Sequence, residues 1–169
     1  MTKAAVIGLG TMGPGISATL ARAGMTVRAY DVSADQRAKA SDLAKQAGGV
    51  LAALGVADRA KGPVAVVDSL AAALDGAELV VETVPERLDI KQAVFKEIDG
   101  LVAKTCVLAS NTSGIPITKL QDGNSAPGRV VGMHWSNPAH VIPMIEVIAG
   151  NQTTPATVTW MVDTVKDLG

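Results

Sequence analysis

The imidazole of His134 and the carboxylate of Glu146 are a pair of side chains that could transfer a proton. Glu146 is an isolated carboxylate within an apolar segment, residues 144–149, and such a position disfavours an unpaired charge. Pro138 and Pro143 lie in the interval between the two residues, which is long enough for the chain to double back. A buried glutamate that accepts a hydrogen bond from an imidazole fixes its tautomer and stabilises the imidazolium formed when the ring takes a proton. We therefore predict that the two side chains form an acid–base pair.

A glycine-rich turn near the N-terminus could hold a phosphate group. Gly8, Gly10 and Gly13 follow the apolar run 4–7 and lead into residues 14–23, whose apolar side chains recur at helical spacing. A turn between a strand and a helix points free backbone N–H groups and the positive end of the helix dipole at an anion. In such a turn, Gly8 permits the tight bend, Gly10 lets a pyrophosphate approach, and Gly13 lets the helix pack on the strand.

Asp31 follows a second predicted strand, residues 26–30, and could bind the ribose of a dinucleotide. A carboxylate at that strand end can accept hydrogen bonds from both ribose hydroxyls, and it would repel a 2′-phosphate. Together with the glycine-rich turn, this residue predicts that the cofactor is NAD.

Polar side chains also gather where the later predicted strands end. They are Glu82, Glu86, residues 111–113 and Asn137. Because the carboxyl ends of parallel strands meet at one edge of the sheet, where ligands bind in such folds, we expect these side chains to converge with His134. We expect His140, by contrast, to be a surface or structural residue.

Strand and helix signals alternate along the chain, which predicts an α/β fold: a Rossmann-like, doubly wound, mostly parallel sheet with helices on both faces. The predicted strands are residues 4–7, 26–30, 64–67, 78–81, 105–110, 129–133 and 144–149. The predicted helices include residues 14–23, 69–74, 88–98 and 154–168, and Gly169 is the predicted C-cap of the last one. A further helix begins at the capping box Ser33-Ala34-Asp35-Gln36 and is ended or interrupted by Gly48-Gly49, and a short helical piece follows at 50–54.

The composition of the chain limits the classes of protein to which it could belong. The 169 residues suit one domain, and a net charge of −1 gives no electrostatic basis for binding nucleic acid or an anionic membrane. Only 2% of the residues are aromatic, so the core must be built from Ala, Val, Ile and Leu. Cys106 is the single cysteine, which excludes an intrachain disulfide, and we expect it to be buried and inert. We expect no metal site and no membrane segment, and a cytoplasmic location.

Several motifs together resemble the NAD-binding domain of the L-3-hydroxyacyl-CoA dehydrogenase family, over nearly the whole chain. They are Gly8-x-Gly10-x-Met12-Gly13, Val81-Glu82 with Glu86, Ser110-Asn-Thr-Ser113, Gly132-Met-His134-x-x-Asn137-Pro138 and Glu146-Val-Ile. The resemblance implies a Rossmann-like domain followed by a mostly helical dimerisation domain. It also implies reversible, NAD-dependent oxidation of a 3-hydroxyacyl-CoA to the 3-ketoacyl-CoA.

The resemblance further implies roles for individual residues. His134 would be the general base for the hydroxyl proton, with Glu146 as its partner, while Ser113 and Asn137 would hold the reacting oxygen and the nicotinamide side. The implied cofactor-binding set is Gly8, Gly10, Thr11, Met12, Gly13, Asp31, Glu86, Lys91, Ser113 and Asn137.

The chain departs from the family pattern in two places that bear on the substrate. Trp135 and Ser136 stand where the family usually has two phenylalanines, and the stretch from Asp31 to Val64 is short for the CoA enzymes. No serine and lysine there match those that bind CoA, although Lys39, Lys45, Arg59 and Lys61 are available. Related dehydrogenases of free hydroxy acids, such as gulonate or carnitine, share the motifs, so a free β-hydroxy acid is an alternative substrate. A non-catalytic NAD-binding module is the alternative outside enzymes, although a module that only senses NADH needs no proton acceptor.

The last predicted helix ends on a C-cap, where the fold would continue into another strand. We therefore expect residues 1–169 to be an NAD-binding domain cut from a longer protein before its helical domain, with a homodimer for the full-length protein. On that view the chain should expose an apolar patch around Trp160 and Met161.

Overall fold

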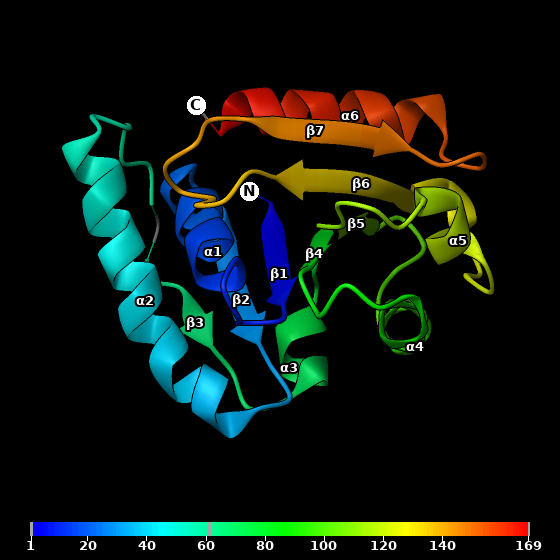
Figure 1. The fold of residues 1–169 in the computed structure, drawn as a ribbon, viewed down its shortest axis with the longest axis horizontal. Helices are drawn as coiled ribbons and strands as arrows, with labels where there is room; N and C mark the ends of the chain where they lie inside the picture. Colours follow the sequence, from blue (N-terminus) through cyan, green and yellow to red (C-terminus); the bar gives the residue numbers. More distant parts are fainter. Residues whose placement is uncertain (1, 61, 169) are drawn as a thin grey trace.

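In a computed structural model that describes residues 2–60 and 62–168, strands and helices alternate along the chain (Figure 1). The strands of this part of the chain are β1 (Lys3–Ile7), β2 (Thr26–Tyr30), β3 (Ala65–Val66), β4 (Leu79–Glu82), β5 (Val107–Ser110), β6 (Val130–Trp135) and β7 (Ile145–Ala149). Its helices are α1 (Gly13–Arg22), α2 (Ala34–Ala53), α3 (Leu70–Leu74), α4 (Leu88–Asp99), α5 (Ile117–Gln121) and α6 (Pro155–Asp167), with a 3-10 turn, η1 (Pro127–Arg129).

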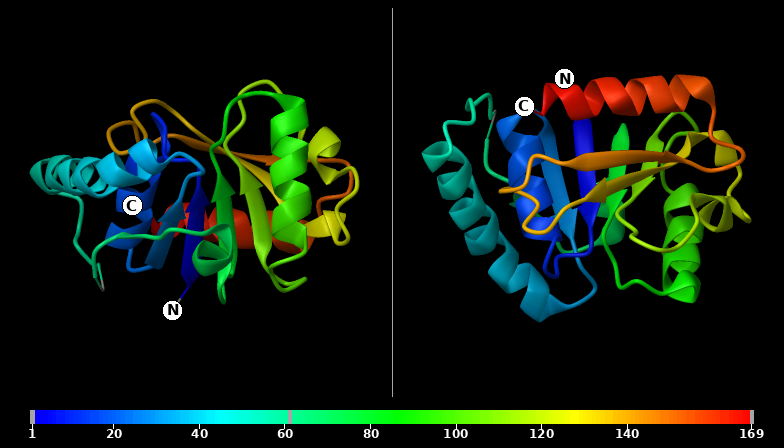
Figure 2. Two further views of the ribbon diagram at one scale, coloured as in Figure 1. Left: turned by 90° about the horizontal axis from the view of Figure 1, so that it is seen from below. Right: turned by 45° about the horizontal axis from the view of Figure 1, so that its top comes forward.

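All strands of the described part join one sheet in the order β3-β2-β1-β4-β5-β6-β7. The pairs from β3 to β6 are parallel, and β7 runs antiparallel to β6 at the edge, as Figure 2 shows. The chain order reverses between β1 and β4, so the carboxyl ends of these two strands flank the topological switch point where ligands bind in such sheets. This arrangement confirms the predicted doubly wound, mostly parallel Rossmann-like sheet.

The two faces of the sheet carry separate hydrophobic cores, each covered by helices (Figures 1 and 2). One core packs side chains of α1, α2 and α6, including Ile16, Leu20 and Met161, against the sheet. The other packs α3, α4 and α5, including Leu74 and Phe95, on the opposite face. Small aliphatic strand residues let both helical layers approach the sheet closely, as the composition predicts.

The helix starts that the sequence predicts are confirmed by their caps. The side chains of Ser33, Ser69 and Thr154 accept hydrogen bonds from the backbone N–H three residues on, at 3.4, 3.2 and 3.2 Å. Each bond satisfies one of the free N–H groups of a first helical turn, which is why a serine or threonine fixes where the helix begins. The predicted C-cap, Gly169, lies outside the described residues.

The prediction that Gly48-Gly49 ends or interrupts the second helix is wrong, because α2 continues to Ala53. Two interior glycines cost a helix about 1 kcal/mol each relative to alanine. Ala47 and Leu51 are buried on both sides of them and pack against Ala18 of α1, and this tertiary contact outweighs the local preference. Helix α5 and the turn η1 lie in segments for which the sequence predicts no helix, and η1 includes Arg129, the first residue of the strand predicted at 129–133.

Two further expectations concern single side chains. Met161 is fully buried in the core, and Trp160 is half-buried, so the predicted exposed patch around them is wrong. The exposed large apolar side chains at this end of the chain lie instead between residues 141 and 148. Cys106 is buried as predicted, and burial raises the pKa of its thiol to about 11, which disfavours the reactive thiolate.

Candidate active site

The glycine-rich turn joins β1 to α1 at the switch point of the sheet. Gly8 has φ +102°, a conformation that favours glycine, and its N–H donates to the carbonyl of Tyr30 at 2.9 Å. The Thr83 hydroxyl donates to the Gly8 carbonyl at 2.8 Å. A Cβ on Gly8 would lie 2.7 Å from the backbone of Thr83, so only glycine lets β1 and the β4 loop approach this closely. The turn is therefore fixed from both neighbouring strands.

Gly13 and Gly10 serve opposite purposes in the same turn. A Cβ on Gly13 would lie 2.0 Å from the Gly8 carbonyl oxygen, so this glycine lets the first turn of α1 pack on the strand end. A Cβ on Gly10 would meet nothing within 4 Å, and Gly10 is exposed. The open space beside Gly10, at the N-terminal end of α1, suits a pyrophosphate that approaches the backbone.

Asp31 extends from the end of β2 to the glycine-rich turn. Its Oδ2 accepts a hydrogen bond from the Leu9 N–H at 2.7 Å, and its Oδ1 accepts one from the Ser33 N–H at 2.8 Å. These bonds fix the orientation of the carboxylate, and each oxygen keeps a lone pair that can accept from a ribose hydroxyl. The residue thus positions the turn and remains available to a nucleotide.

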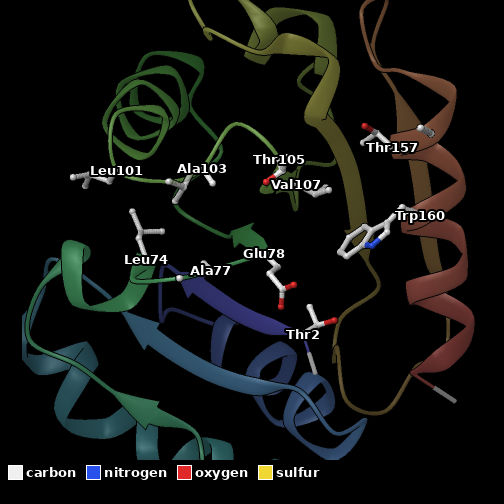
Figure 3. Close-up of a pocket in the computed structure, with 13 residues that line it drawn as sticks. Thr2, Leu74, Ala77, Glu78, Leu101, Ala103, Thr105, Val107, Thr157 and Trp160 are labelled. Atoms are coloured by element: carbon white, nitrogen blue, oxygen red, sulfur yellow. The ribbon is translucent and has the colours of Figure 1, made fainter.

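A groove of about 710 Å³ connects these features. Gly8, Gly10, Thr11 and Asp31 line it together with apolar side chains of α4. A second cavity, of about 490 Å³, lies at the opposite ends of the parallel strands, between the starts of β4 and β5 and Trp160 of α6 (Figure 3). Of these two, the first contains the glycine-rich turn and is therefore the candidate dinucleotide site. Its residues fit NAD.

His134 and Glu146 face each other across the antiparallel pair β6–β7. They are directly opposite in register, and His134 Nδ1 lies 2.6 Å from Glu146 Oε2. The predicted pair is therefore present, and the carboxylate favours the tautomer with the proton on Nδ1. The remaining ring nitrogen, Nε2, is the one that can accept a proton.

The expectation that Glu146 is buried is wrong. Its side chain is 57% exposed, and that of His134 is 25% exposed. Strand β7 is at the edge of the sheet, and Ile148, which points to the same side as Glu146, is 38% exposed. The residues on the other side of β7 pack on the α6 core, so the strand buries one face and leaves the face with Glu146 open.

Glu86 organises the loop that carries Ser113. One carboxylate oxygen accepts from the Thr112 hydroxyl at 2.5 Å and from the N–H groups of Ser113 and Gly114 at 2.9 and 3.0 Å. Burial alone would raise the pKa of Glu86, but these hydrogen bonds and the Lys91 ammonium lower it below its ordinary value of 4.5. Ser113 itself is exposed at the tip of the loop. The sequence did not reveal the part played by Thr112.

Lys91 lies beneath this loop rather than at its surface. Its side chain is 0% exposed, and its ammonium is 2.7 Å from Glu82 and 3.5 Å from Glu86. Glu82 is also buried; desolvation raises the pKa of its carboxyl, although the Lys91 ammonium and the Ser110 hydroxyl oppose that shift. The buried pair links α4 to the ends of β4 and β5. Lys91 thus reaches the loop through Glu86, and direct contact of Lys91 with NAD stays a prediction.

Asn137 completes the predicted set on the segment after β6, where it is exposed beside Pro138. His140 is half-buried against α1, close to Gly15, in keeping with a structural residue. No group of three or more His, Cys, Asp and Glu side chains among residues 2–60 and 62–168 could hold a metal ion. No helix in those residues is both long and apolar enough to cross a membrane.

The fold and this groove define a dinucleotide-binding domain of the Rossmann type. Residues 3–169 match the family described as 3-hydroxyacyl-CoA dehydrogenase, NAD binding domain. The chain therefore belongs to that family and is its NAD-binding domain.

Individual relatives differ in their substrates. The chain is 52% identical, over 98% of its length, to the 5-formyl-3-hydroxy-2-methylpyridine 4-carboxylate 5-dehydrogenase of Mesorhizobium japonicum, of which it covers 54%. It is 35% identical, over 94% of its length, to an L-carnitine dehydrogenase of Streptomyces griseus, of which it covers 48%. A crystal structure of a dehydrogenase of the same formyl-pyridine carboxylic acid, described as an NAD+ dependent dismutase, matches with a TM-score of 0.96 and 50% identity, over 100% of this chain and 56% of that one. The chain thus spans about half the length of these relatives.

Proposed function

We propose that this domain serves an NAD-dependent dehydrogenase that acts on a small, carboxylate-bearing alcohol or aldehyde without CoA. The observation that carries the proposal is the His134–Glu146 pair at 2.6 Å, on the same sheet as the dinucleotide groove. A protein that only bound NADH would have no use for an oriented proton acceptor.

The chemistry proposed for His134 is removal of a hydroxyl proton. Its Nε2 accepts the proton from the substrate O–H as a C=O bond forms and hydride leaves the same carbon. NAD+ bound in the groove would supply the hydride acceptor. Glu146 holds the Nδ1 proton and stabilises the imidazolium that results. The same step converts the hydrate of an aldehyde into a carboxylic acid, so alcohols and formyl groups are both within its reach.

The preference for a free acid rests on the relatives. Both of the named relatives act on small molecules whose names carry no CoA. The lysines and arginine available for CoA, Lys39, Lys45 and Arg59, are exposed, and Lys61 lies outside the described residues. Trp135, where the family usually has phenylalanine, is buried in the core that α6 covers and favours neither candidate substrate.

A 3-hydroxyacyl-CoA is the second candidate substrate, and the family description favours it. The two candidates are separated by a direct assay of the purified protein, after NADH binding is confirmed by fluorescence. NADH formation is followed with 5-formyl-3-hydroxy-2-methylpyridine 4-carboxylate and with L-carnitine, and NADH loss with acetoacetyl-CoA. Turnover with a free acid alone supports the proposal, and turnover with the thioester alone supports the second candidate. NADH binding without turnover on any of the three would contradict both.

The variant His134→Gln tests the mechanism. We expect it to lower turnover on the active substrate by about 100-fold or more, the usual contribution of a positioned acid–base group. His140→Gln is the matched control, because it removes the other histidine from a half-buried structural position. NADH affinity should be unchanged in both variants. Turnover near the wild-type value in His134→Gln would refute the assignment.

A further inference from the structure

The end of β6 that carries His134 extends beyond its neighbour β5. The β5–β6 pairing ends at Ser110 and Gly132, whereas β6 continues to Trp135 and pairs there with β7. On the β5 side, the Trp135 N–H donates instead to the side-chain oxygen of Asn111 at 2.8 Å. The Asn111 amide thus takes the place of a strand backbone and satisfies a hydrogen bond that β5 is too short to make.

Asn111 can hold this position because the loop around it is itself fixed. Its backbone N–H donates to the Glu82 carbonyl at 2.8 Å, at the end of β4. The next three residues donate to Glu86, which is tied to the buried Lys91. The amide oxygen of Asn111 therefore projects from a rigid base on β4 and α4.

The bond made by Asn111 bears directly on the His134 imidazole. Trp135 is the residue after His134, and the 2.6 Å contact between His134 and Glu146 requires the end of β6 to stay in register with β7. On the far side of Trp135, the Ser136 N–H reaches Met144 at 3.3 Å, a longer bond than the one to Asn111. Without Asn111 the Trp135 N–H has no acceptor on the β5 side, and the strand end that carries the imidazole is held by β7 alone.

We propose that Asn111 is a positioning residue for catalysis: it holds the end of β6 so that His134 Nδ1 stays on Glu146 and Nε2 faces the substrate. This inference rests on the proposed function of His134. It assigns a task to a residue of the Ser110-Asn-Thr-Ser113 motif that has no part in the cofactor groove or in proton transfer.

The direct test observes the tautomer of His134 rather than activity. The chain has 2 histidines, so ¹⁵N-histidine labelling gives two imidazoles, and His134→Gln assigns them. Spectra are recorded at about pH 9, well above the pKa of about 6.5 that histidine has in model peptides. In the wild type, Nδ1 of His134 should carry the proton. In Asn111→Ala the ratio of the Nδ1–H to the Nε2–H form should fall by about tenfold, the change expected when a hydrogen bond to a charged group weakens.

Three further variants make this test decisive. Asn111→Gln keeps the amide but displaces it by one methylene, so it should show the same change even where Asn111→Ala folds poorly. Asn111→Asp keeps an acceptor oxygen at the same reach and should retain the wild-type tautomer. Asn124→Ala is the matched control, because Asn124 also accepts from a backbone N–H, that of Ala126 at 3.0 Å, in the loop before η1. It should leave the tautomer unchanged.

An unchanged His134 tautomer in both Asn111→Ala and Asn111→Gln would overturn the inference, whatever their melting temperatures. Turnover provides a separate reading: kcat should fall in these two variants while NADH affinity stays at the wild-type value. The wild type could show the expected tautomer, and the two variants could lose it, while no substrate is turned over. In that case the proposed function fails and the positioning of His134 by Asn111 stands.

Discussion

Among single residues, the carboxylates of the candidate site are held in place by hydrogen bonds within the protein. Asp31 and Glu86 each accept from two or more donors, and in both cases the donors include backbone N–H groups of a site loop. A carboxylate held in this way is oriented before any ligand arrives. These two residues therefore shape the loops of the candidate site.

Glu86 makes a prediction about acid stability. Its pKa is lowered in the folded state, so its contribution to stability is fully present above its ordinary value of 4.5 and is lost as pH falls from there through the folded value. Glu86→Gln should therefore lower the free energy of unfolding at pH 7. The difference from the wild type should shrink as pH falls below about 4.5. Urea unfolding at several pH values measures both curves, and a difference that grows on acidification would contradict the assignment.

At the scale of elements, the glycines show how context decides what one residue type does. Gly48 lies in the interior of α2, has no positive φ, and a Cβ there would meet nothing within 4 Å. Gly13 lies at the start of α1, where a Cβ would meet the Gly8 carbonyl oxygen at 2.0 Å. Gly48 therefore lowers the stability of its helix, whereas Gly13 is required by the turn.

Substitution by alanine should therefore have opposite effects at these two positions. Gly48→Ala should raise the free energy of unfolding by about 0.5–1 kcal/mol, because alanine loses less backbone entropy in a helix. Gly13→Ala should destabilise the fold and abolish NADH binding, because the turn must open to admit the methyl group. Denaturant unfolding and NADH fluorescence titration measure the two effects. A destabilised Gly48→Ala would mean that α2 is not continuous at that point.

At the scale of the whole molecule, the dinucleotide groove is built from the ends of β1, β2 and β4, so a bound cofactor joins segments distant in sequence. NADH binds the folded state and should raise its stability by mass action, by about 2.7 kcal/mol at a concentration 100 times its Kd. NADPH should stabilise less, because Asp31 repels its 2′-phosphate.

Asp31→Ala should reduce the difference between the thermal shifts that NADH and NADPH produce. Asp75→Ala is the matched control, because Asp75 pairs with Arg28 of β2, away from the groove. An unchanged preference for NADH in Asp31→Ala would remove the residue from the ribose site.

The order and type of the elements that carry the candidate site could be predicted from the residues alone. Gly8, Gly10 and Gly13 are required by the turn they form, and the caps at Ser33, Ser69 and Thr154 mark helix starts through contacts within three residues. Such local requirements can be read from spacing. The pairing of His134 with Glu146 could also be predicted, because one hairpin separates them.

Which of these side chains are buried, and what they contact, depends on how the elements pack in three dimensions. Glu146 is exposed because β7 is the edge strand of this sheet, and Lys91 is buried because α4 packs its side chain under the loops after β4 and β5. Helix α2 passes through two glycines because α1 lies beside it. The bond from Trp135 to Asn111 depends on the lengths of two neighbouring strands. Burial and pairing of this kind depend on contacts between elements far apart in the chain. They therefore cannot be predicted from the local pattern of residues.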